Sequence, residues 1–388
     1  MQAETAGSLP RYNLTATLEP GDRRLPARIS GQLTLILPEP GTYGESVYLR
    51  LYPNAPGYGD GGMILSDVSV DGVAVVPELS AESTVAAIPL GSGWQPGHTA
   101  EITVRFVSDV PVHSRTGFGM YSVKPESGAI SLAHWYPMLA GIGPSGPEIG
   151  LPSAIGDPVF SLPALYDVWF DAPAELAIVG AGWTVDREVS GDVQRLHIVA
   201  GPAREFPIVA GTDWQALTIQ AGDVTIRSWA PSAQVLDSQR IAEWAAAALD
   251  SFGRRFGSYP FRELDLVQMD LFGAAGMEFP GLVLLDPSNY LASTSERRFS
   301  EMVVAHEVAH QWWYGIVVND QNIEAFIDEG LSEYAAVALY FGDRYGPDEA
   351  DAQMDLLVES WVRSALESNG DEVVDRPTDA YRDRSSYS

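Results

Sequence analysis

The hydrophobic periodicity of this chain changes once, near residue 212, and this change limits the folds open to it. Before that point, apolar and polar residues alternate in short runs between Gly and Pro turns, as in 32–37, 47–51 and 101–106. This pattern is typical of half-buried strands. After it, apolar residues recur at helical spacing: Ile241, Trp244, Ala245, Ala248, Leu249 and Phe252. We therefore expect a β domain over 1–212 and a second domain over 213–388.

The second region mixes strands with helices. Short strands are expected at 217–219, 224–229 and 264–267, the last leading into a glycine-bearing stretch. Ser293 followed by Glu296 is typical of a capping box and predicts a helix that runs on through Tyr314. Another helix is expected over 323–341. The fold class is therefore multidomain, β and then α+β.

Composition excludes several classes of protein. The chain has no cysteine, so disulfides and thiolate ligands are excluded, and a transition-metal site must use His, Asp or Glu. The net charge of −29 argues against nucleic-acid binding. The first residues lack the pattern of a signal peptide, and no apolar stretch is long enough to span a membrane. We expect a soluble chain, cytoplasmic, or extracytoplasmic if an upstream signal has been removed.

His306 and His310 lie four residues apart in the predicted capped helix, so both imidazoles project from one face and can bind one ion. Glu329, on the next helix, is the expected third ligand, which leaves one zinc position open for water. Glu307 then lies beside that open position as the general base and is not itself a ligand. The sequence thus predicts one catalytic Zn²⁺ per chain.

A plainer interpretation treats these residues as hydrogen-bonded histidines and solvated glutamates. The apolar residues that flank the motif argue against it, because an exposed charged pair is rarely set among them: Val303, Val304, Trp312 and Trp313. Glu333, one turn after Glu329, either supports a ligand or is a solvated helix charge. The four histidines of the β region have no ligand spacing and are interpreted as structural or surface residues: His98, His113, His134 and His197.

Several segments together carry a family resemblance over nearly the whole chain. The segments are Leu51–Ala55, His134–Met138, Phe256–Pro260, Gly276–Gly281, His306–Trp313 and Asp328–Tyr334. They resemble the aminopeptidase N family of gluzincin zinc metallopeptidases. The pairing of the histidine motif with an upstream Gly-Met-Glu is much narrower than the histidine motif alone.

This resemblance implies an N-terminal antiparallel β-sandwich-like domain followed by a thermolysin-like catalytic domain. It assigns Glu278 to the free α-ammonium group of the substrate, with Gly276 and Met277 beside it in substrate binding. The expected partners are therefore peptides with a free N-terminus. Gly276 and Gly281 also allow close backbone approach, so an extended substrate can lie along this edge. Phe279 departs from the Asn that the family commonly has there.

The expected function is that of a zinc-dependent aminopeptidase, which hydrolyses the N-terminal peptide bond with a zinc-activated water. The alternatives are an endopeptidase or epoxide hydrolase on the same scaffold, or a non-catalytic binding module. A base beside the metal argues against the last. The preferred first residue, the physiological substrate and the oligomeric state stay open.

The resemblance also implies a helical C-terminal region and an oxyanion-stabilising tyrosine downstream of the third ligand. We expect this tyrosine beyond residue 388, with Tyr387 and Tyr381 as weaker candidates. The catalytic domain is therefore expected to be incomplete at its C-terminal end. The 388-residue chain should then bind zinc but be a poor catalyst, since losing one oxyanion donor costs about a hundredfold to a thousandfold in rate.

Overall fold

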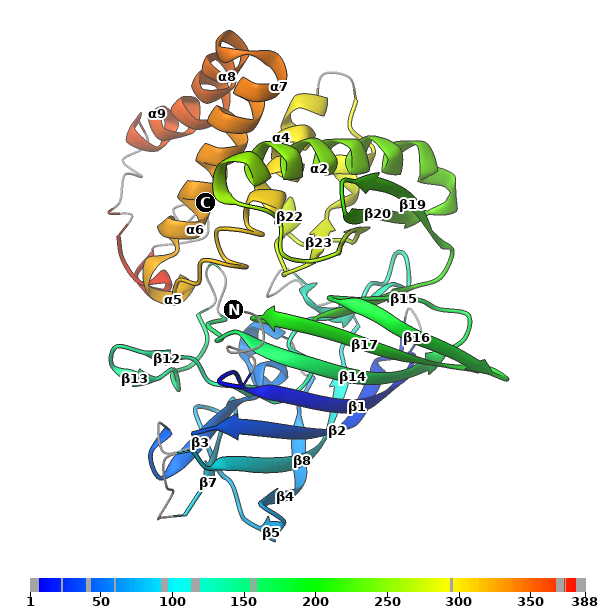
Figure 1. Ribbon diagram of the computed structural model, residues 1–388, viewed down its shortest axis with the longest axis vertical. Helices are drawn as coiled ribbons and strands as arrows, with labels where there is room; N and C mark the ends of the chain where they lie inside the picture. The colour runs from blue at the N-terminus through cyan, green and yellow to red at the C-terminus, as the bar shows by residue number, and fades with distance from the viewer. Residues whose placement is uncertain are drawn as a thin grey trace. The chain divides into compact units, whose positions relative to one another are not determined.

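The structure is a computed structural model that describes residues 7–21, 24–39, 43–58, 61–91, 97–112, 119–153, 156, 159–293, 296–367, 373 and 375–381. The chain divides into two compact units. Unit 1 comprises 1–152 with 160–213, and unit 2 comprises 153–159 with 214–388. The predicted class, β and then α+β, is confirmed (Figure 1). The exact domain limits of 1–212 and 213–388 stay a prediction.

Unit 1 is built on an eight-stranded sheet within the described residues. Its order is β16 (Trp183–Ser190), β17 (Val193–Ala203), β14 (Ala164–Pro173), β1 (Arg11–Glu19), β2 (Ala27–Pro38), β8 (Thr99–Val110), β4 (Ile64–Val70) and β5 (Val73–Ala74). Strands β1, β2, β8 and β14 alternate buried and more exposed residues, as half-buried strands do. One pair departs from the antiparallel expectation, because β1 lies parallel to β14.

Two smaller sheets and a hairpin complete the strands of unit 1. One sheet has the order β15 (Ala177–Gly180), β18 (Ile208–Gly211), β10 (Ile130–Leu132) and β9 (Tyr121–Val123). The other has the order β11 (Met138–Leu139), β3 (Ser46–Arg50), β7 (Val85–Pro89) and β6 (Glu78–Ser80). The hairpin joins β12 (Ile142–Gly143) to β13 (Gly146–Pro147). Short 3₁₀ turns lie at Tyr52–Asn54 and Pro56–Tyr58.

The core of unit 1 is rich in buried aromatic rings. Trp135 lies between Tyr136 and Phe170 in edge contacts, and its indole donates to the Phe206 carbonyl. His134 is buried between the Tyr58 hydroxyl and the Glu205 carboxylate. The segment that contributes these residues to the family resemblance therefore has a structural role in this unit.

Unit 2 has a five-stranded sheet with the order β19 (Trp214–Ala221), β20 (Val224–Pro231), β21 (Glu263–Gln268), β23 (Leu282–Leu285) and β22 (Gly276–Met277). The 22-residue helix α2 (Val235–Phe256) packs beside this sheet, as Figure 1 shows. Its apolar stripe, which includes Ile241, Ala245 and Phe252, is fully buried. No helix in the described part of the chain is long and apolar enough to cross a membrane.

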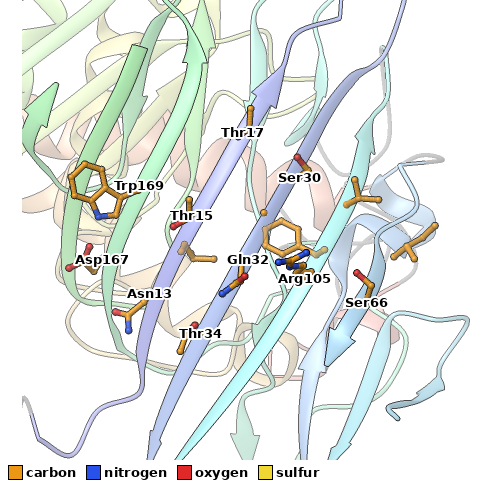
Figure 2. A pocket seen from close by; sticks show the side chains of 15 residues that line it. Asn13, Thr15, Thr17, Ser30, Gln32, Thr34, Ser66, Arg105, Asp167 and Trp169 are labelled. Atoms are coloured by element: carbon orange, nitrogen blue, oxygen red, sulfur yellow. The ribbon is translucent and has the colours of Figure 1, made fainter. Parts of the chain in front are cut away.

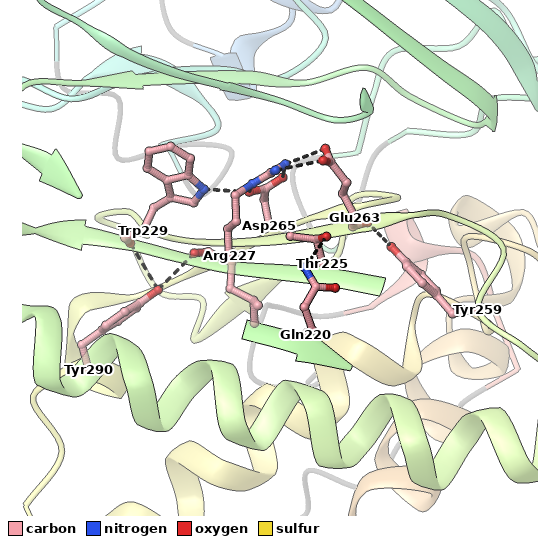
Figure 3. A network of polar contacts seen from close by, with 9 residues as sticks. Gln220, Thr225, Arg227, Trp229, Tyr259, Glu263, Asp265 and Tyr290 are labelled. Carbon is pink, nitrogen blue, oxygen red and sulfur yellow. Dashed lines mark hydrogen bonds and ion pairs between the residues drawn. The ribbon is translucent and has the colours of Figure 1, made fainter. Parts of the chain in front are cut away.

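A polar network holds β20 to β21 in parallel register (Figure 3). The Arg227 guanidinium donates to the carboxylates of Glu263 and Asp265, at 2.6 to 2.9 Å. The Trp229 indole also donates to Asp265, at 2.7 Å. Burial raises the pKa of Asp265, although Arg227 lowers it. Because every carboxylate oxygen here has a donor, the network stabilises the sheet on which the second half of the unit is built.

The remaining helical elements follow the sheet in chain order. They are α3 (Pro287–Tyr290), α4 (Arg297–Ala309), α5 (Gln321–Glu324), α6 (Phe326–Tyr334), the π-helix η6 (Ala335–Tyr340), α7 (Phe341–Tyr345), α8 (Pro347–Gln353), the π-helix η7 (Met354–Glu359), α9 (Ser360–Glu367) and a 3₁₀ turn at Thr378–Ala380. A 3₁₀ turn at Ser232–Gln234 precedes α2.

Two helix predictions need correction. The helix that carries the histidine motif begins at Arg297 and ends at Ala309, not at Tyr314. Beyond it the chain tightens, since Trp312 and Trp313 both donate to the Ala309 carbonyl, and Tyr314 has a φ of 129°. The helix expected over 323–341 is instead α5, α6 and η6, because the segment breaks at Ala325 and then widens to π geometry.

Candidate metal centre

Helix α4 presents two different faces. Val304 and Val308 are fully buried in the core of unit 2, together with residues of α2 and the sheet. This packing fixes the orientation of the helix. Because of the helical period, His306 and His310 then project toward α6. The two imidazoles lie in an edge-to-face arrangement with ring centroids 4.6 Å apart.

Three ligand-type side chains converge at this point. The Nε2 atoms of His306 and His310 are 3.0 Å apart. The Oε2 of Glu329 lies 3.2 Å from the first and 3.8 Å from the second. Donor atoms of all three residues lie within 4.8 Å of one another. The structure thus brings together the three residues that the spacing predicted as ligands.

The outer ring nitrogens already have partners. His306 Nδ1 lies 3.1 Å from a Glu333 carboxylate oxygen, and His310 Nδ1 lies 3.0 Å from the Trp313 carbonyl. When the rings are neutral and Nδ1–H donates in each, the lone pairs of both Nε2 atoms face the centre. Glu333, left open at the sequence level, therefore supports a histidine.

The electrostatic balance at the centre favours a cation. Burial lowers the pKa of His306, but Glu329 and Glu333 outweigh it and raise that pKa well above its usual value. Burial also lowers the pKa of His310, and the nearby Glu278 and Glu329 raise it to about 9. Desolvation opposes ionisation of Glu329, yet both histidines hold the pKa of its carboxyl well below the usual range. A field that favours protons on imidazoles also favours a divalent ion between them.

The residues present fit zinc. Two imidazole nitrogens and one carboxylate oxygen form the donor set of catalytic zinc sites with one open position. The side chain of Glu329 is 41% exposed, whereas that of His310 is 1% exposed, so the centre has a closed side and an open side. Glu278, His310 and Asp328 form a second cluster of possible metal ligands, which shares His310 with the first cluster.

Glu307 lies against this centre but does not belong to either group of ligand atoms. It is buried, and its Oε2 has no hydrogen-bond partner among the described residues. Burial raises the pKa of its carboxyl to about 7, while His306 and His310 lower it. Its other oxygen lies against the backbone of Gly276, where an added Cβ would be 2.2 Å from Oε1. Gly276 therefore makes the space that Glu307 occupies.

The Gly276–Gly281 segment reaches the centre along a sheet edge. Gly276 and Met277 form β22, which pairs with β23 and is the terminal strand of the sheet within the described residues. Glu278 follows directly and is 7% exposed. Its carboxylate lies close enough to His310 to belong to the second cluster of possible ligands. Phe279 is buried rather than turned toward solvent.

Sequence reasoning missed Gln311, which connects this segment to the motif. Its fully buried amide accepts from the Gly281 N–H at 2.8 Å and donates to the carbonyls of Glu278 and Phe279 at 3.4 and 3.2 Å. The sequence feature that could have indicated this role is an amide residue close to apolar Ala309 and Trp312. Asp328 was missed as well; the Asn319 amide donates to it at 2.8 Å, and burial raises its pKa to about 6.

The structure describes one of the two tyrosine candidates, Tyr381. Tyr381 is buried, with the Arg376 guanidinium 4.3 Å from its ring centroid. Tyr387 lies outside the described residues. The oxyanion donor stays a prediction.

Comparison with known proteins finds similarity to zinc peptidases and aminopeptidases. Residues 241–375 match the family described as "Peptidase family M1 domain". Aminopeptidase N of Bos taurus is 26% identical over 196 residues, which are 48% of this chain and 19% of that protein. Aminopeptidase 2 of Candida albicans is 36% identical over 111 residues, 26% of this chain and 12% of that protein. The matched stretches thus span less than a third of either relative.

A solved structure shares the fold over nearly the whole chain. The M1 zinc metallopeptidase of Deinococcus radiodurans superposes with a TM-score of 0.63 at 18% identity, covering 98% of this chain and 79% of that one. At this identity the likeness shows the fold alone. Residues 241–375 are thus similar to the M1 peptidase family, and the aminopeptidase relatives agree with that match.

Proposed function

We propose that this chain is a zinc-dependent aminopeptidase whose zinc is held by His306, His310 and Glu329. The observation that carries the proposal is a convergence of three donor atoms beside a buried carboxylate oxygen that has no hydrogen-bond partner among the described residues. The match of residues 241–375 to the M1 peptidase family supports zinc and peptide hydrolysis. A mutant of the Deinococcus enzyme has been solved with the peptide Tyr-Ser-Ala bound, which supports a peptide as the substrate class.

When bound, zinc supplies a Lewis acid for the scissile carbonyl and makes a water molecule more acidic. Glu307 takes the proton from that water at Oε2, the oxygen that has no partner among the described residues. A buried carboxylate in this position can accept the proton and later return it to the leaving amine. Gly276 keeps the space around the carboxylate open.

Glu278 is proposed to bind the free α-ammonium group of the substrate. Its buried carboxylate lies within reach of His310, so an ammonium group paired with it is held close to the metal ligands. An ion pair at that distance allows only the first peptide bond to reach Glu307. Met277 and Gly276, on the terminal strand β22, are proposed to hydrogen-bond the substrate backbone as an added strand.

Elemental analysis tests the metal assignment independently of activity. The purified chain should contain one zinc per molecule, and Glu329→Ala should lose it. Glu324→Ala is the matched control, because Glu324 is an exposed glutamate on the preceding helix α5 and should keep the zinc. Wild-type protein that holds no metal above background after zinc addition would overturn the assignment.

Product analysis tests the aminopeptidase assignment. A peptide with a free N-terminus should lose its first residue, and its N-acetylated form should resist cleavage because it cannot pair with Glu278. Glu278→Ala should then lower cleavage of the free peptide while the zinc content is unchanged. Equal cleavage of both peptides would favour the endopeptidase alternative.

A further inference from the structure

A groove of about 820 Å³ lies on the outer face of the eight-stranded sheet of unit 1, and the proposed peptidase function does not use it. Its side chains come from neighbouring strands β14, β1, β2, β8 and β4 (Figure 2). Seven of the fifteen residues that line it carry a hydroxyl or an amide. We propose that this groove binds a neutral oligosaccharide.

Strand register arranges the groove side chains in a row across the sheet. Thr15 is paired with Trp169 on one side and with Gln32 on the other. Gln32 is paired in turn with Arg105, and Arg105 with Ser66. Paired residues project from the same face of a sheet. Five strands therefore contribute to one row of polar groups, and Trp169 lies on one side of it, as Figure 2 shows.

Trp169 is a preorganised aromatic surface. Its ring stacks on the His197 imidazole with centroids 4.3 Å apart and planes 3° apart. The imidazole is itself held by Asp167, at 2.9 Å. Although it is backed in this way, the tryptophan is 37% exposed. The electron-rich face of an indole attracts the polarised C–H groups on one face of a pyranose ring, and a ring that is already fixed loses little entropy on binding.

The floor of the groove carries groups that match sugar hydroxyls. Thr15, Thr17 and Ser30 offer hydroxyls, and Asn13 and Gln32 offer amides, all on the outer face of β1 and β2. Each of these groups both donates and accepts hydrogen bonds, as a sugar hydroxyl does. Because the side chains between Trp169 and Arg105 are short, the space is wide: three strand spacings of about 4.8 Å lie between β14 and β8.

The groove is lined by one acidic and one basic residue, Asp167 and Arg105. Asp167 lies 2.9 Å from the His197 ring, and Arg105 lies 3.6 Å from Asp67. A chain with a net charge of −29 thus presents a nearly neutral surface here. Nucleic acids and acidic polysaccharides need an excess of positive charge, so the ligand expected here is uncharged.

The sheet face also distinguishes a saccharide from a peptide. An extended peptide binds by adding its backbone to a free strand edge. The backbone groups of β14, β1, β2 and β8 are already paired with neighbouring strands on both sides. Only side chains face the groove, and these suit a ligand that carries its hydrogen-bonding groups around rings.

Calorimetric titration of the purified chain with three neutral probes tests the proposal: cellohexaose, maltohexaose and chitohexaose. At least one should bind with a dissociation constant below about 1 mM. Trp169→Ala should weaken that binding by about tenfold or more, since it removes the stacking surface. Gln32→Ala should weaken it by a smaller factor, and a thermal melt should show that both variants remain folded.

Trp183→Ala is the matched control. Trp183 is also an exposed tryptophan, 48% accessible on β16, which β17 separates from β14, and it is not among the residues that line the groove. Its loss should change binding by less than about twofold. The proposal is overturned if none of the three probes binds, if Trp169→Ala binds as wild type does, or if polygalacturonate binds more tightly than every neutral probe. Because no readout here involves zinc or peptide cleavage, failure of this proposal is distinguishable from failure of the proposed function.

Discussion

Helix α4 carries two buried glutamates, and their hydrogen bonding differs. Glu301 is 1% exposed and lies 2.7 to 2.9 Å from donors on Arg298, Arg344, Tyr340 and Tyr345. Glu307, about two turns later, is 6% exposed, and its Oε2 has no hydrogen-bond partner among the described residues. The Glu301 carboxylate is hydrogen-bonded from several directions, and the Glu307 carboxylate lies near the two histidines proposed as ligands.

The difference shows how one helix combines stability with chemistry. A buried charge with full hydrogen bonding ties α4 to η6 and α7, which lie directly after the helix that carries Glu329. A buried charge without such bonds is costly to the fold, and that cost is typical of a group kept for reactivity. The two ends of α4 should therefore respond in opposite ways to the same kind of substitution.

Glu307→Gln should have the largest effect on rate. The amide cannot take up a proton, so hydrolysis of an aminoacyl amide should fall by about two to four orders of magnitude. Zinc content should not change, because Glu307 is outside the ligand set. The free energy of unfolding should stay the same or rise by about 1 kcal/mol, since a poorly satisfied buried charge is removed. Unchanged turnover would remove Glu307 from the role of base.

Glu301→Ala should instead damage the fold. Removing one partner of a buried ion pair typically costs about 3–5 kcal/mol. Here the lower end is expected, because Arg298 and Arg344 are 42% and 32% exposed and can turn to water. Urea denaturation measures the loss. Glu349→Ala is the control, since its contact with Arg298 is partly exposed and should be worth no more than about 1 kcal/mol.

Gly276→Ala examines the space around Glu307. The added Cβ would lie 2.2 Å from Oε1, so the carboxylate must move. A displacement of about 1 Å near the reacting atoms costs on the order of a hundredfold in rate. Zinc content should be unchanged. Gly330→Ala is the control, because a Cβ there meets no atom within 4 Å. If Gly276→Ala kept full activity, Glu307 would not need its present position.

The local part of the centre was predictable from sequence. Residues four apart on a helix share a face, so the pairing of His306 with His310 follows from periodicity alone. The burial of Val304 and Val308 follows from the same period. The strands around 32–37 and 101–106 were also found, because alternation identifies a half-buried strand whatever its partner is.

The non-local part was not predictable in the same way. Register decides that β1 lies parallel to β14, and that Thr15 meets Trp169, which is 154 positions later. The partners of Glu301 and the end of α4 at Ala309 likewise depend on segments that fold onto the helix. A single sequence has no signal for such contacts. The groove and the support of α4 therefore became visible only in three dimensions.

Glu333→Gln should have the smallest effect on the zinc site. Glu333 extends the comparison of Glu301 with Glu307, because it is a carboxylate that acts through another residue. It lies 3.1 Å from His306 Nδ1 and orients the ring, so that Nε2 faces the centre. Partners of this kind typically contribute tenfold to a hundredfold in metal affinity. Competition with a zinc chelator should therefore show weaker binding by about that factor, with one zinc still bound at saturation. Glu324→Gln, on the exposed side of α5, should bind zinc as wild type does. If Glu333→Gln also matched wild type, the contact with His306 would be a solvated helix charge, and the orientation of the ring would depend on the packing of α4 alone.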